Sequence, residues 1–438
     1  FFFAMADAAC LLLEPEPRSE MSSGSQHSLG SQCLKPRWPY LVSGFVAGLV
    51  MAVVWLMTTT AVSPTTDLRA PLPLRLPAAL LRTILWPRPQ DSKAFSCKTT
   101  RLRIKGSVPA ARSSHSISVA GGAAYLLGGE HVARTPIDST LYRLDLAAPR
   151  AAWAVVECGG DVPPPRVAHS QAVVPQADGA AHLYIFGGRV GISMDEKPLN
   201  DLHRAVLSPD GRAGTWEALQ AKGRVPSPRS FHVMAAIGDQ LYVFGGCGAT
   251  GRLSELHRLD TPTLTWTQLP SLPAAGRGGA GFFASRDGKS LFVIAGFAGE
   301  EMADLHRFSV EDGKWTELHV DLDRGDFLRP RSVYAHATLQ PSGHLVIIGG
   351  EVNPSDKGHE GAGGFARDVL LVDASGDGDA VVIHSSKMPK AFEPRGWYSA
   401  AATQDGRVVL FGGLAGDDEA PHRLDDTWVL SDFVIPNA

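Results

Sequence analysis

The chain has 438 residues, of which 44% are hydrophobic, and a formal net charge of −4, which gives no basis for nucleic-acid binding. The five cysteines have neither a Cys-x-x-Cys nor any other paired spacing. The cysteine pattern therefore predicts neither a disulfide framework nor a zinc module.

The N-terminal region is predicted to hold a disordered tail and a membrane anchor. Residues 1–37 are rich in serine and proline and lack apolar periodicity. An apolar stretch follows, with no charge between Arg37 and Asp67. It is long enough to cross the roughly 30 Å hydrocarbon core of a bilayer, so we predict a transmembrane helix at 38–62. A cleaved signal peptide is the alternative, but the stretch starts late and lacks a compact basic segment before it.

The flanks of this stretch do not settle its orientation. Lys35 and Arg37 precede it while Arg69 and Arg75 follow it, so the positive-inside rule gives a near tie. Residues 63–99 are rich in proline and are predicted to link the membrane to the main domain. The sequence thus predicts a single-pass membrane protein whose side of the membrane is undetermined.

One pattern then occurs six times, an arginine-led turn followed by an apolar strand that ends in a pair of glycines. The leading arginines are Arg112, Arg166, Arg229, Arg277, Arg331 and Arg395. In the fourth copy Ala295 replaces the first glycine. The copies recur about every 57 residues, close to the roughly 50 residues of a kelch repeat, which forms one blade of a β-propeller.

The repeats predict an all-β ring. Each copy has room for four short strands separated by glycine and proline turns. One such blade cannot bury both faces alone, so six must stack around an axis. Tryptophans in four copies are expected to pack between neighbouring blades, namely Trp153, Trp216, Trp266 and Trp315. We predict a six-bladed kelch propeller over residues 100–435, preceded by the tail and the transmembrane helix.

The last copy contains only three predicted strands before Ala438. Residues 100–105, just before the first blade, have the alternation of a β-strand. Because open sheet edges are usually covered, we predict that this segment completes the sixth blade and closes the ring. The alternative is a disordered lead-in to the first blade.

The loop after the fifth glycine pair concentrates acidic residues, a histidine and glycines within residues 351–364. With this loop, the six repeats resemble the plant kelch specifier proteins, namely the nitrile-specifier, epithiospecifier and thiocyanate-forming proteins. The resemblance covers residues 100–435. It implies a protein that acts with ferrous iron on glucosinolate aglucones, which myrosinase releases.

The resemblance also implies a metal site. The iron site of the family is a Glu-x-x-x-Asp-x-x-x-His loop after a glycine pair. Glu351 and His359 match its first and last positions, while the middle acid is displaced by one residue to Asp356. Two carboxylates and one imidazole would form the facial triad favoured by non-haem Fe(II). The implied cofactor is therefore Fe(II), held by Glu351, Asp356 and His359.

Three further residues match ligand-binding positions of the family. Arg166 and Arg229 match the mouth arginines thought to hold the sulfate of the aglucone, a role that suits a guanidinium fork. Trp397 matches a tryptophan at the mouth. The alternative for the arginines is an architectural role, since all six turns carry one, and for Trp397 it is packing between blades.

The histidines of the repeats are predicted to be structural. His115, His169 and His232 follow a leading arginine by three residues and are expected to be buried strand positions. A second set, His203, His257 and His306, recurs at one strand position of three different blades. Residues spaced around the ring in this way cannot converge on one ion.

Three functions remain open at this stage. The first is a specifier-like, lyase-type activity on a small anionic molecule at one ring face, with Fe(II) as the catalytic metal. The second is a non-catalytic protein–protein interaction scaffold, in which the fifth loop is structural. The third is a copper-radical oxidase, for which the sequence shows no convincing ligand set. We favour a membrane-anchored propeller that binds a small ligand or a protein partner.

Overall fold

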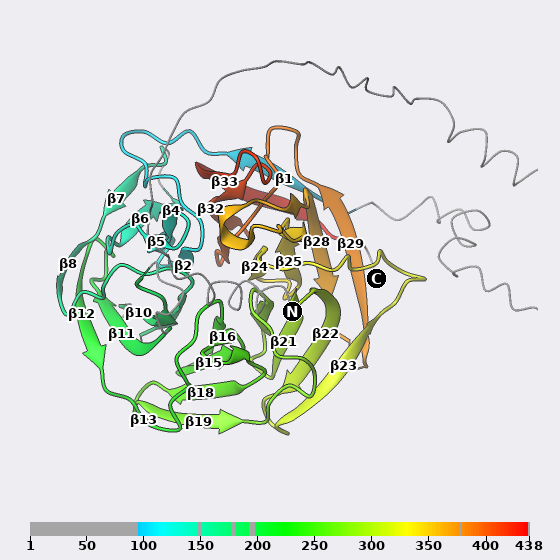
Figure 1. Ribbon diagram of the computed structural model, residues 1–438, viewed down its shortest axis with the longest axis horizontal. Helices are drawn as coiled ribbons and strands as arrows, with labels where there is room; N and C mark the ends of the chain where they lie inside the picture. The colour runs from blue at the N-terminus through cyan, green and yellow to red at the C-terminus, as the bar shows by residue number, and fades with distance from the viewer. Residues whose placement is uncertain (1–94, 148–149, 177–179, 192–197, 377, 437–438) are drawn as a thin grey trace, which may run out of the picture. The chain divides into compact units, whose positions relative to one another are not determined.

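The computed structural model describes residues 95–147, 150–176, 180–191, 198–376 and 378–436. These residues form β-sheets arranged as a ring around one axis (Figure 1). The described part of the chain contains no α-helix, and its one helical turn is a 3-10 helix, η1 (Gly358–Glu360). The fold of this region is therefore all-β.

The first three blades each consist of four antiparallel strands in sequence order. Blade 1 contains β2 (Ser116–Ala120), β3 (Ala123–Leu127), β6 (Tyr142–Asp145) and β7 (Trp153–Val155). Blade 2 contains β9 (Ser170–Pro175), β10 (Ala181–Gly188), β11 (Leu199–Leu207) and β12 (Ala213–Leu219). Blade 3 contains β14 (Val233–Ile237), β15 (Gln240–Phe244), β18 (Leu256–Asp260) and β19 (Thr265–Leu269).

The other three blades complete the ring. Blade 4 contains β20 (Gly281–Ala284), β21 (Ser290–Phe297), β22 (Glu301–Ser309) and β23 (Lys314–Val320). Blade 5 contains β24 (Ala335–Thr338), β25 (Leu345–Ile348), β28 (Asp368–Asp373) and β29 (Ala380–Lys387). Blade 6 contains β31 (Ser399–Ala402), β32 (Val408–Ala415), β33 (His422–Val434) and β1 (Ser96–Arg101), and β30 (Arg395–Gly396) also pairs with β32.

Short strands extend several blades. On the outer side, β8 (Glu157–Gly160) and β13 (Lys222–Gly223) pair in parallel with β12 and β19. The outer strand of blade 5, β29, also pairs in parallel with β23 of blade 4. Three hairpins follow glycine pairs, namely β4 (Glu130–Val132) with β5 (Thr135–Pro136), β16 (Cys247–Gly248) with β17 (Gly251–Arg252), and β26 (Glu351–Asn353) with β27 (Gly364–Phe365). We call the side of the ring formed by the loops after the glycine pairs the loop face.

An N-terminal strand supplies the outer strand of blade 6. β1 runs antiparallel to β33, from the pair Ser96 and Val434 to the pair Arg101 and Trp428. The strand lies slightly earlier in the chain than the segment 100–105 that the alternation indicated. Pairing with the C-terminal strand covers the edge that blade 6 would otherwise expose.

A closed ring of backbone hydrogen bonds surrounds the axis. In each blade, the residue two positions after the leading arginine donates its N–H to the carbonyl of the equivalent residue in the preceding blade, at 2.7 to 3.0 Å. The six residues, which we call the axial ring, are Ser114, Ala168, Phe231, Gly279, Val333 and Trp397. Because the bond from Ser114 to Trp397 closes the cycle, the ring has six members, one from each blade.

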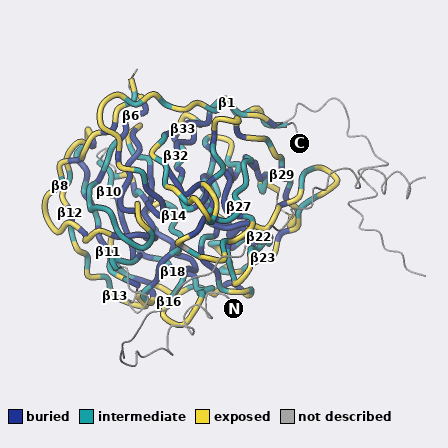
Figure 2. Tube along the Cα trace, turned by 45° about the horizontal axis from the view of Figure 1, so that its top comes forward, coloured by how far each residue is buried: buried dark blue, intermediate teal, exposed yellow. Residues whose placement is uncertain are grey.

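The core consists of apolar clusters between neighbouring blades, and the buried trace follows the inner strands in Figure 2. Trp216 and Trp266 are almost fully buried. The ring of Trp266 lies 5.4 Å from that of Phe186 in blade 2, and Trp315 lies 6.0 Å from Phe244 in blade 3. The prediction that tryptophans pack between blades is confirmed.

The glycine pairs allow close contact with the next blade. Gly128 has a φ of +66°, and a Cβ there would lie 2.6 Å from the carbonyl oxygen of Arg166. A side chain at this position would therefore clash and would also need an unfavourable backbone conformation. Blade 4 tolerates Ala295 at the equivalent place, with a φ of 53°.

The predicted fold class and localisation need correction. The helix expected at 38–62 and the tail 1–37 lie outside the described residues, as does the linker up to residue 94. Among the residues that are described, no helix is long and apolar enough to cross a membrane. The prediction of a transmembrane helix, and with it of a single-pass membrane protein, was therefore wrong. An uncharged apolar stretch of sufficient length is necessary for a spanning helix but does not by itself establish one.

Candidate functional site

The six leading arginines are buried inside the blades, with exposed fractions of 0% to 1%. Arg166 donates from Nη1 to the carbonyl oxygen of Gly187 at 2.9 Å, and from both terminal nitrogens to the Asp201 carboxylate at 2.8 Å. The carboxylate partners of the six are Asp138, Asp201, Glu255, Asp304, Asp368 and Asp426. Each arginine thus joins its turn to the glycine pair and to the third strand of its blade or the segment before it.

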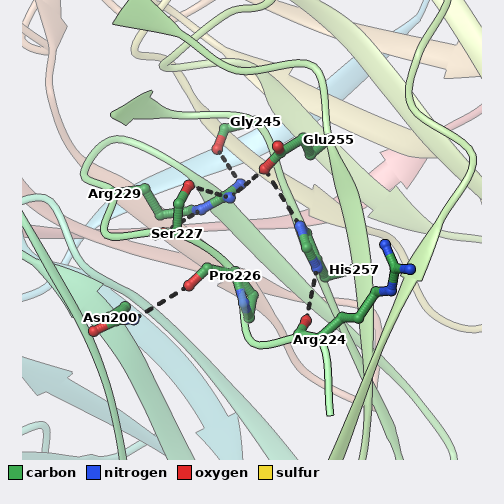
Figure 3. A network of polar contacts seen from close by, with 8 residues as sticks. All are labelled: Asn200, Arg224, Pro226, Ser227, Arg229, Gly245, Glu255 and His257. Atoms are coloured by element: carbon green, nitrogen blue, oxygen red, sulfur yellow. Dashed lines mark hydrogen bonds and ion pairs between the residues drawn. The ribbon is translucent and has the colours of Figure 1, made fainter. Parts of the chain in front are cut away.

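Arg229 shows the same arrangement in detail (Figure 3). It donates from Nη2 to Glu255 Oε2 at 2.6 Å and from Nη1 to the carbonyl oxygen of Gly245 at 3.1 Å, and His257 lies 3.3 Å from the same carboxylate oxygen. Burial opposes ionisation of Glu255, but the hydrogen bond and charge of Arg229 hold the pKa of this carboxyl below its usual value. These contacts favour the architectural role for Arg166 and Arg229. Ligand binding by either arginine stays a prediction.

The two sets of histidines behave as expected from the repeats. His203 and His306 lie 3.5 Å and 2.8 Å from the carboxylates of Asp201 and Asp304, as His257 does from Glu255, so the three are separate. The other set, His115, His169 and His232, is 4% to 5% exposed, which confirms the prediction of buried positions.

These buried histidines share a structural position with two tyrosines. Tyr334 and Tyr398 also follow a leading arginine by three residues, and their hydroxyls donate to the carbonyl oxygens of Ile294 and Ile348 in the preceding blade, at 2.5 Å and 2.7 Å. The ring of His115 packs against Phe411 of blade 6 at 5.7 Å. Burial, and then the charge of Arg112, lowers the pKa of His115 to about 3. Side chains at this position therefore pack against the preceding blade or form hydrogen bonds with it.

An axial channel of about 240 Å³ runs along the inner strands. Its lining includes all six residues of the axial ring. Phe231, Val333 and Trp397 are half-buried, whereas Ser114 and Ala168 are buried. The rings of Phe231 and Trp397 meet edge to face at 5.4 Å. Trp397 thus lines the channel, and its predicted contact with a ligand is untested.

The predicted iron-binding loop is only partly described. Glu351 is 5% exposed, and its carboxylate accepts hydrogen bonds from the backbone N–H groups of Ser355 and Gly363. Burial raises the pKa of Glu351 to about 7. Asp356 is exposed, and the side chain of His359 lies outside the described part of the structure. Iron binding by this loop therefore stays a prediction.

The contacts of Glu351 do not favour a shared ion with Asp356. The first carboxylate is turned into its own loop and the second faces solvent. Among the side chains that the structure describes, no group of three His, Cys, Asp or Glu residues could hold a metal ion.

Sequence reasoning missed a second glutamate in the same position. Glu130 follows the glycine pair of blade 1, and its backbone pairs with Ser113 as that of Glu351 pairs with Ser332. Glu130 is 1% exposed and accepts a hydrogen bond from the N–H of Arg134 at 2.6 Å, four residues later, as Glu351 does from Ser355. The Gly-Gly-Glu sequence in both copies was the available signal.

A third carboxyl lies beside the fifth loop. Glu301 Oε1 accepts a hydrogen bond from Ser332 Oγ at 3.1 Å. Burial, and then the nearby Glu351 carboxyl, raises the pKa of Glu301 to about 8. The repeat pattern gave no signal for Glu301, because Glu351, the carboxyl beside it, belongs to the next blade.

Comparisons with known proteins agree with this architecture. The KLHDC2/KLHL20/DRC7 Kelch-repeats domain model matches residues 114–350. The chain is 30% identical over 294 residues to N-(sulfonatooxy)prop-2-enimidothioate sulfolyase of Thlaspi arvense, across 61% of this chain and 78% of that protein.

Two further relatives extend the similarity to other kelch proteins. The human Rab9 effector protein with kelch motifs is 33% identical over 217 residues, which cover 46% of this chain and 53% of that protein. Adagio protein 3 of Arabidopsis thaliana is 29% identical over 359 residues, which cover 76% and 52%. The match thus spans about half the length of each of these two relatives.

A solved structure supports the fold alone. The structure of YjhT matches with a TM-score of 0.54 and 18% identity, over 73% of this chain and 95% of that one. The match to the family model covers more than half of the chain, and the sulfolyase is matched over more than two thirds of its length. This chain therefore belongs to the kelch-repeat family and is related to a plant sulfolyase of the specifier type.

Proposed function

We propose that this propeller recognises a partner protein at the mouth of the axial channel on the loop face. The contact residues in this proposal are Phe231, Val333 and Trp397 of the axial ring. The supporting observation is their backbone conformation, with φ angles of 55°, 46° and 58°. Bulky and β-branched residues rarely adopt this left-handed region, which costs roughly 1–2 kcal/mol for an L-residue.

The same ring position does not itself require a large side chain. Blade 4 places Gly279 there, with a φ of 60° and the same backbone hydrogen bond. Glycine would relieve the strain at the other positions, so bulky side chains at three of them favour a role for the side chains themselves. Aromatic residues are also enriched among the residues that contribute most to protein interfaces. The name of the human relative, a Rab9 effector, further favours a protein as the partner class.

The test compares the full chain with a Phe231→Gly/Trp397→Gly variant. Because glycine suits a positive φ, this variant is expected to fold and to lose only the aromatic contacts. Val155→Ala/Val162→Ala is the control, since these two side chains are 59% and 45% exposed and do not line the channel. Quantitative cross-linking in extracts of the source organism should identify a protein that the wild type and the control bind and the glycine variant does not. An unchanged set of cross-linked proteins in the glycine variant would contradict the proposal.

A second function is favoured by a specific observation, the 30% identity to the sulfolyase over 294 residues. In this proposal the propeller converts a sulfated thiohydroximate of the kind that the name of that relative specifies. Glu351, Asp356 and His359 are the proposed ligands of an Fe(II) cofactor, which would supply electron donation or Lewis-acid polarisation when bound. The contacts of Glu351 described above do not favour this ligand set, so we derive no step through the metal.

The iron proposal is tested by anaerobic Fe(II) titration of the full chain, followed by calorimetry. Saturable binding that is lost in Glu351→Ala and in His359→Ala, but kept in Glu360→Ala, would support it. Glu360 is an exposed acid of the same loop and lies outside the proposed ligand set. Product analysis after myrosinase releases the aglucone from a glucosinolate then tests the reaction. Absence of saturable Fe(II) binding in the wild type would eliminate this second function and leave the first intact.

A further inference from the structure

The axial channel has room for more than a few waters. Its volume of about 240 Å³ corresponds to roughly eight water molecules at the ~30 Å³ that each occupies in the liquid. A single organic molecule of modest size would fill the same space. Which of these it favours depends on the chemistry of its walls.

The two halves of the channel differ in polarity. Blades 6, 1 and 2 contribute hydroxyl and amide side chains to the lining, namely Ser399, Ser116, Ser170 and Gln171. Blades 3, 4 and 5 contribute apolar side chains that include Met234, Phe282 and Ala337. Tyr334 and His336, on this second side, have polar atoms bonded to backbone groups of blade 4. The channel therefore has a polar wall on one side of the ring and, on the other, a largely apolar wall that also includes His232.

In the described part of the chain, two oxygen atoms of the polar wall lack partners, as do the ring nitrogens of His115 and His169 beside them. The Gln171 side chain donates from Nε2 to the carbonyl oxygen of Tyr125 at 2.9 Å, which fixes the orientation of its amide. Gln171 Oε1 and Ser170 Oγ are buried and have no hydrogen-bond partner among the described residues. Both residues are more than nine-tenths buried, with exposed fractions of 8% and 7%. Buried polar atoms are nearly always hydrogen-bonded, so these two indicate a partner that occupies the channel.

The described residues that line the channel carry no formal charge near neutral pH. They include no Asp, Glu, Lys or Arg side chain. Burial, assisted by nearby Arg112 and Arg229, lowers the pKa of His115 and His232 to about 3, and burial lowers that of His336 to about 4. Burial and the charge of Arg166 also lower the pKa of His169 well below its usual value. An ion in this channel would lose its hydration without gaining a counter-charge.

We propose that the axial channel binds one small neutral amphipathic molecule. Its hydrogen-bond donor meets Gln171 Oε1 and Ser170 Oγ, and its apolar part lies against Met234 and Phe282. Carboxamides and similar neutral donors attached to an apolar group have this chemistry. The inference goes beyond the proposed partner binding and does not depend on it, because it rests on Gln171 and Ser170 and not on the large side chains of the axial ring.

Benzamide is a suitable probe, and benzoate is its charged counterpart of nearly the same shape. We expect saturable binding of benzamide to the full chain in titrations followed by ligand-detected NMR and calorimetry. Because benzoate lacks the donor and carries a charge, its binding should be at least tenfold weaker. Gln171→Met and Ser170→Ala should each weaken benzamide binding at least threefold. Gln268→Leu, at an exposed position of β19, is the control and should leave binding unchanged.

Three results would overturn this inference. They are absence of saturable benzamide binding to the wild type, equally strong binding of benzoate, and unchanged binding in the two channel variants. The first result would mean that the channel holds only water. If Gln171→Met does not fold because Tyr125 loses its donor, Ser170→Ala decides, since that hydroxyl has no protein partner to lose among the described residues.

Discussion

The loops after the first and fifth glycine pairs have the same start and opposite electrostatic surroundings. Both begin Gly-Gly-Glu, and each glutamate accepts the N–H of the residue four positions later. Beside Glu130 lies Arg423, and burial lowers the pKa of this guanidinium while the Glu130 charge opposes the change. Beside Glu351 lie Glu301 and Asp418, two further carboxyls.

This comparison changes the interpretation of Glu351. In sequence, the fifth loop looked unlike every other copy, and its glutamate looked like a metal ligand. In the first loop, a glutamate at this position accepts a hydrogen bond from the backbone of its own loop. The same loop contact accounts for the position of Glu351 in the repeat. What differs between the two loops is the charge that the neighbouring blade supplies.

The largest expected effect is that of Glu130→Gln. The substitution removes the carboxylate beside Arg423, whose Nη2 is buried and has no hydrogen-bond partner among the described residues. Glu130 is the opposite charge that acts on this partly buried guanidinium, and it also accepts the hydroxyls of Ser113 and Ser114, so we expect its loss to lower the free energy of unfolding by about 3 kcal/mol. Urea unfolding followed by circular dichroism measures this loss. A loss below about 1 kcal/mol would show that solvent already compensates Arg423.

A double-mutant cycle isolates the interaction between these two groups. Arg423→Met removes the charge while keeping an unbranched side chain, and in the Glu130→Gln background it should restore about 2 kcal/mol of stability. The coupling should weaken in 1 M salt only slightly, because Glu130 is almost fully buried. Additive effects of the two substitutions would contradict an electrostatic coupling between Glu130 and Arg423.

The carboxyls of Glu301 and Glu351 should make the stability of the fold depend on pH in the opposite direction to the buried histidines. Glu301 and Glu351 have pKa values raised to about 8 and about 7, so between pH 4.5 and 8 the folded state binds more protons than the unfolded state. Their contribution to stability is therefore present below pH 4.5 and is lost as the pH rises toward 8.

Unfolding from pH 5 to 9 measures this contribution. Relative to wild type, Glu301→Gln/Glu351→Gln should become steadily more stable from pH 5 to pH 9, because the variant lacks the two carboxyls whose ionisation destabilises the fold. His115 and His232, with a pKa lowered to about 3, destabilise the fold only as the pH falls below 6.5. They remain in both proteins, so their effect cancels in the difference. A difference that does not change with pH would mean that the two carboxyls are ionised throughout.

The ring was predictable from the sequence because its requirements repeat. The positive φ angles of the glycine pairs, the buried leading arginines and the interblade tryptophans each recur at fixed places in the pattern. The charges around the two glutamates were not predictable, because they come from other blades. Arg423 and Ser113, whose side chains lie 3.4 Å apart, are 310 residues apart in sequence. The carboxylate partners of the arginines were visible as acidic positions, but their pairing needed the fold.

The smallest expected effect is that of Glu351→Gln alone, and the contrast with Glu130→Gln is the sharpest test of the comparison. At pH 8 glutamine keeps an acceptor for the N–H of Ser355 or Gly363 and removes a buried carboxylate that has other carboxyls for neighbours. The lost hydrogen bond and the relieved repulsion should nearly cancel, so we expect a change within about 1 kcal/mol in either direction. The same substitution at Glu130 has no such compensation, since its charge faces a guanidinium. If the two variants lost equal stability, the backbone hydrogen bonds of the loops, and not their charged neighbours, would determine what these glutamates contribute.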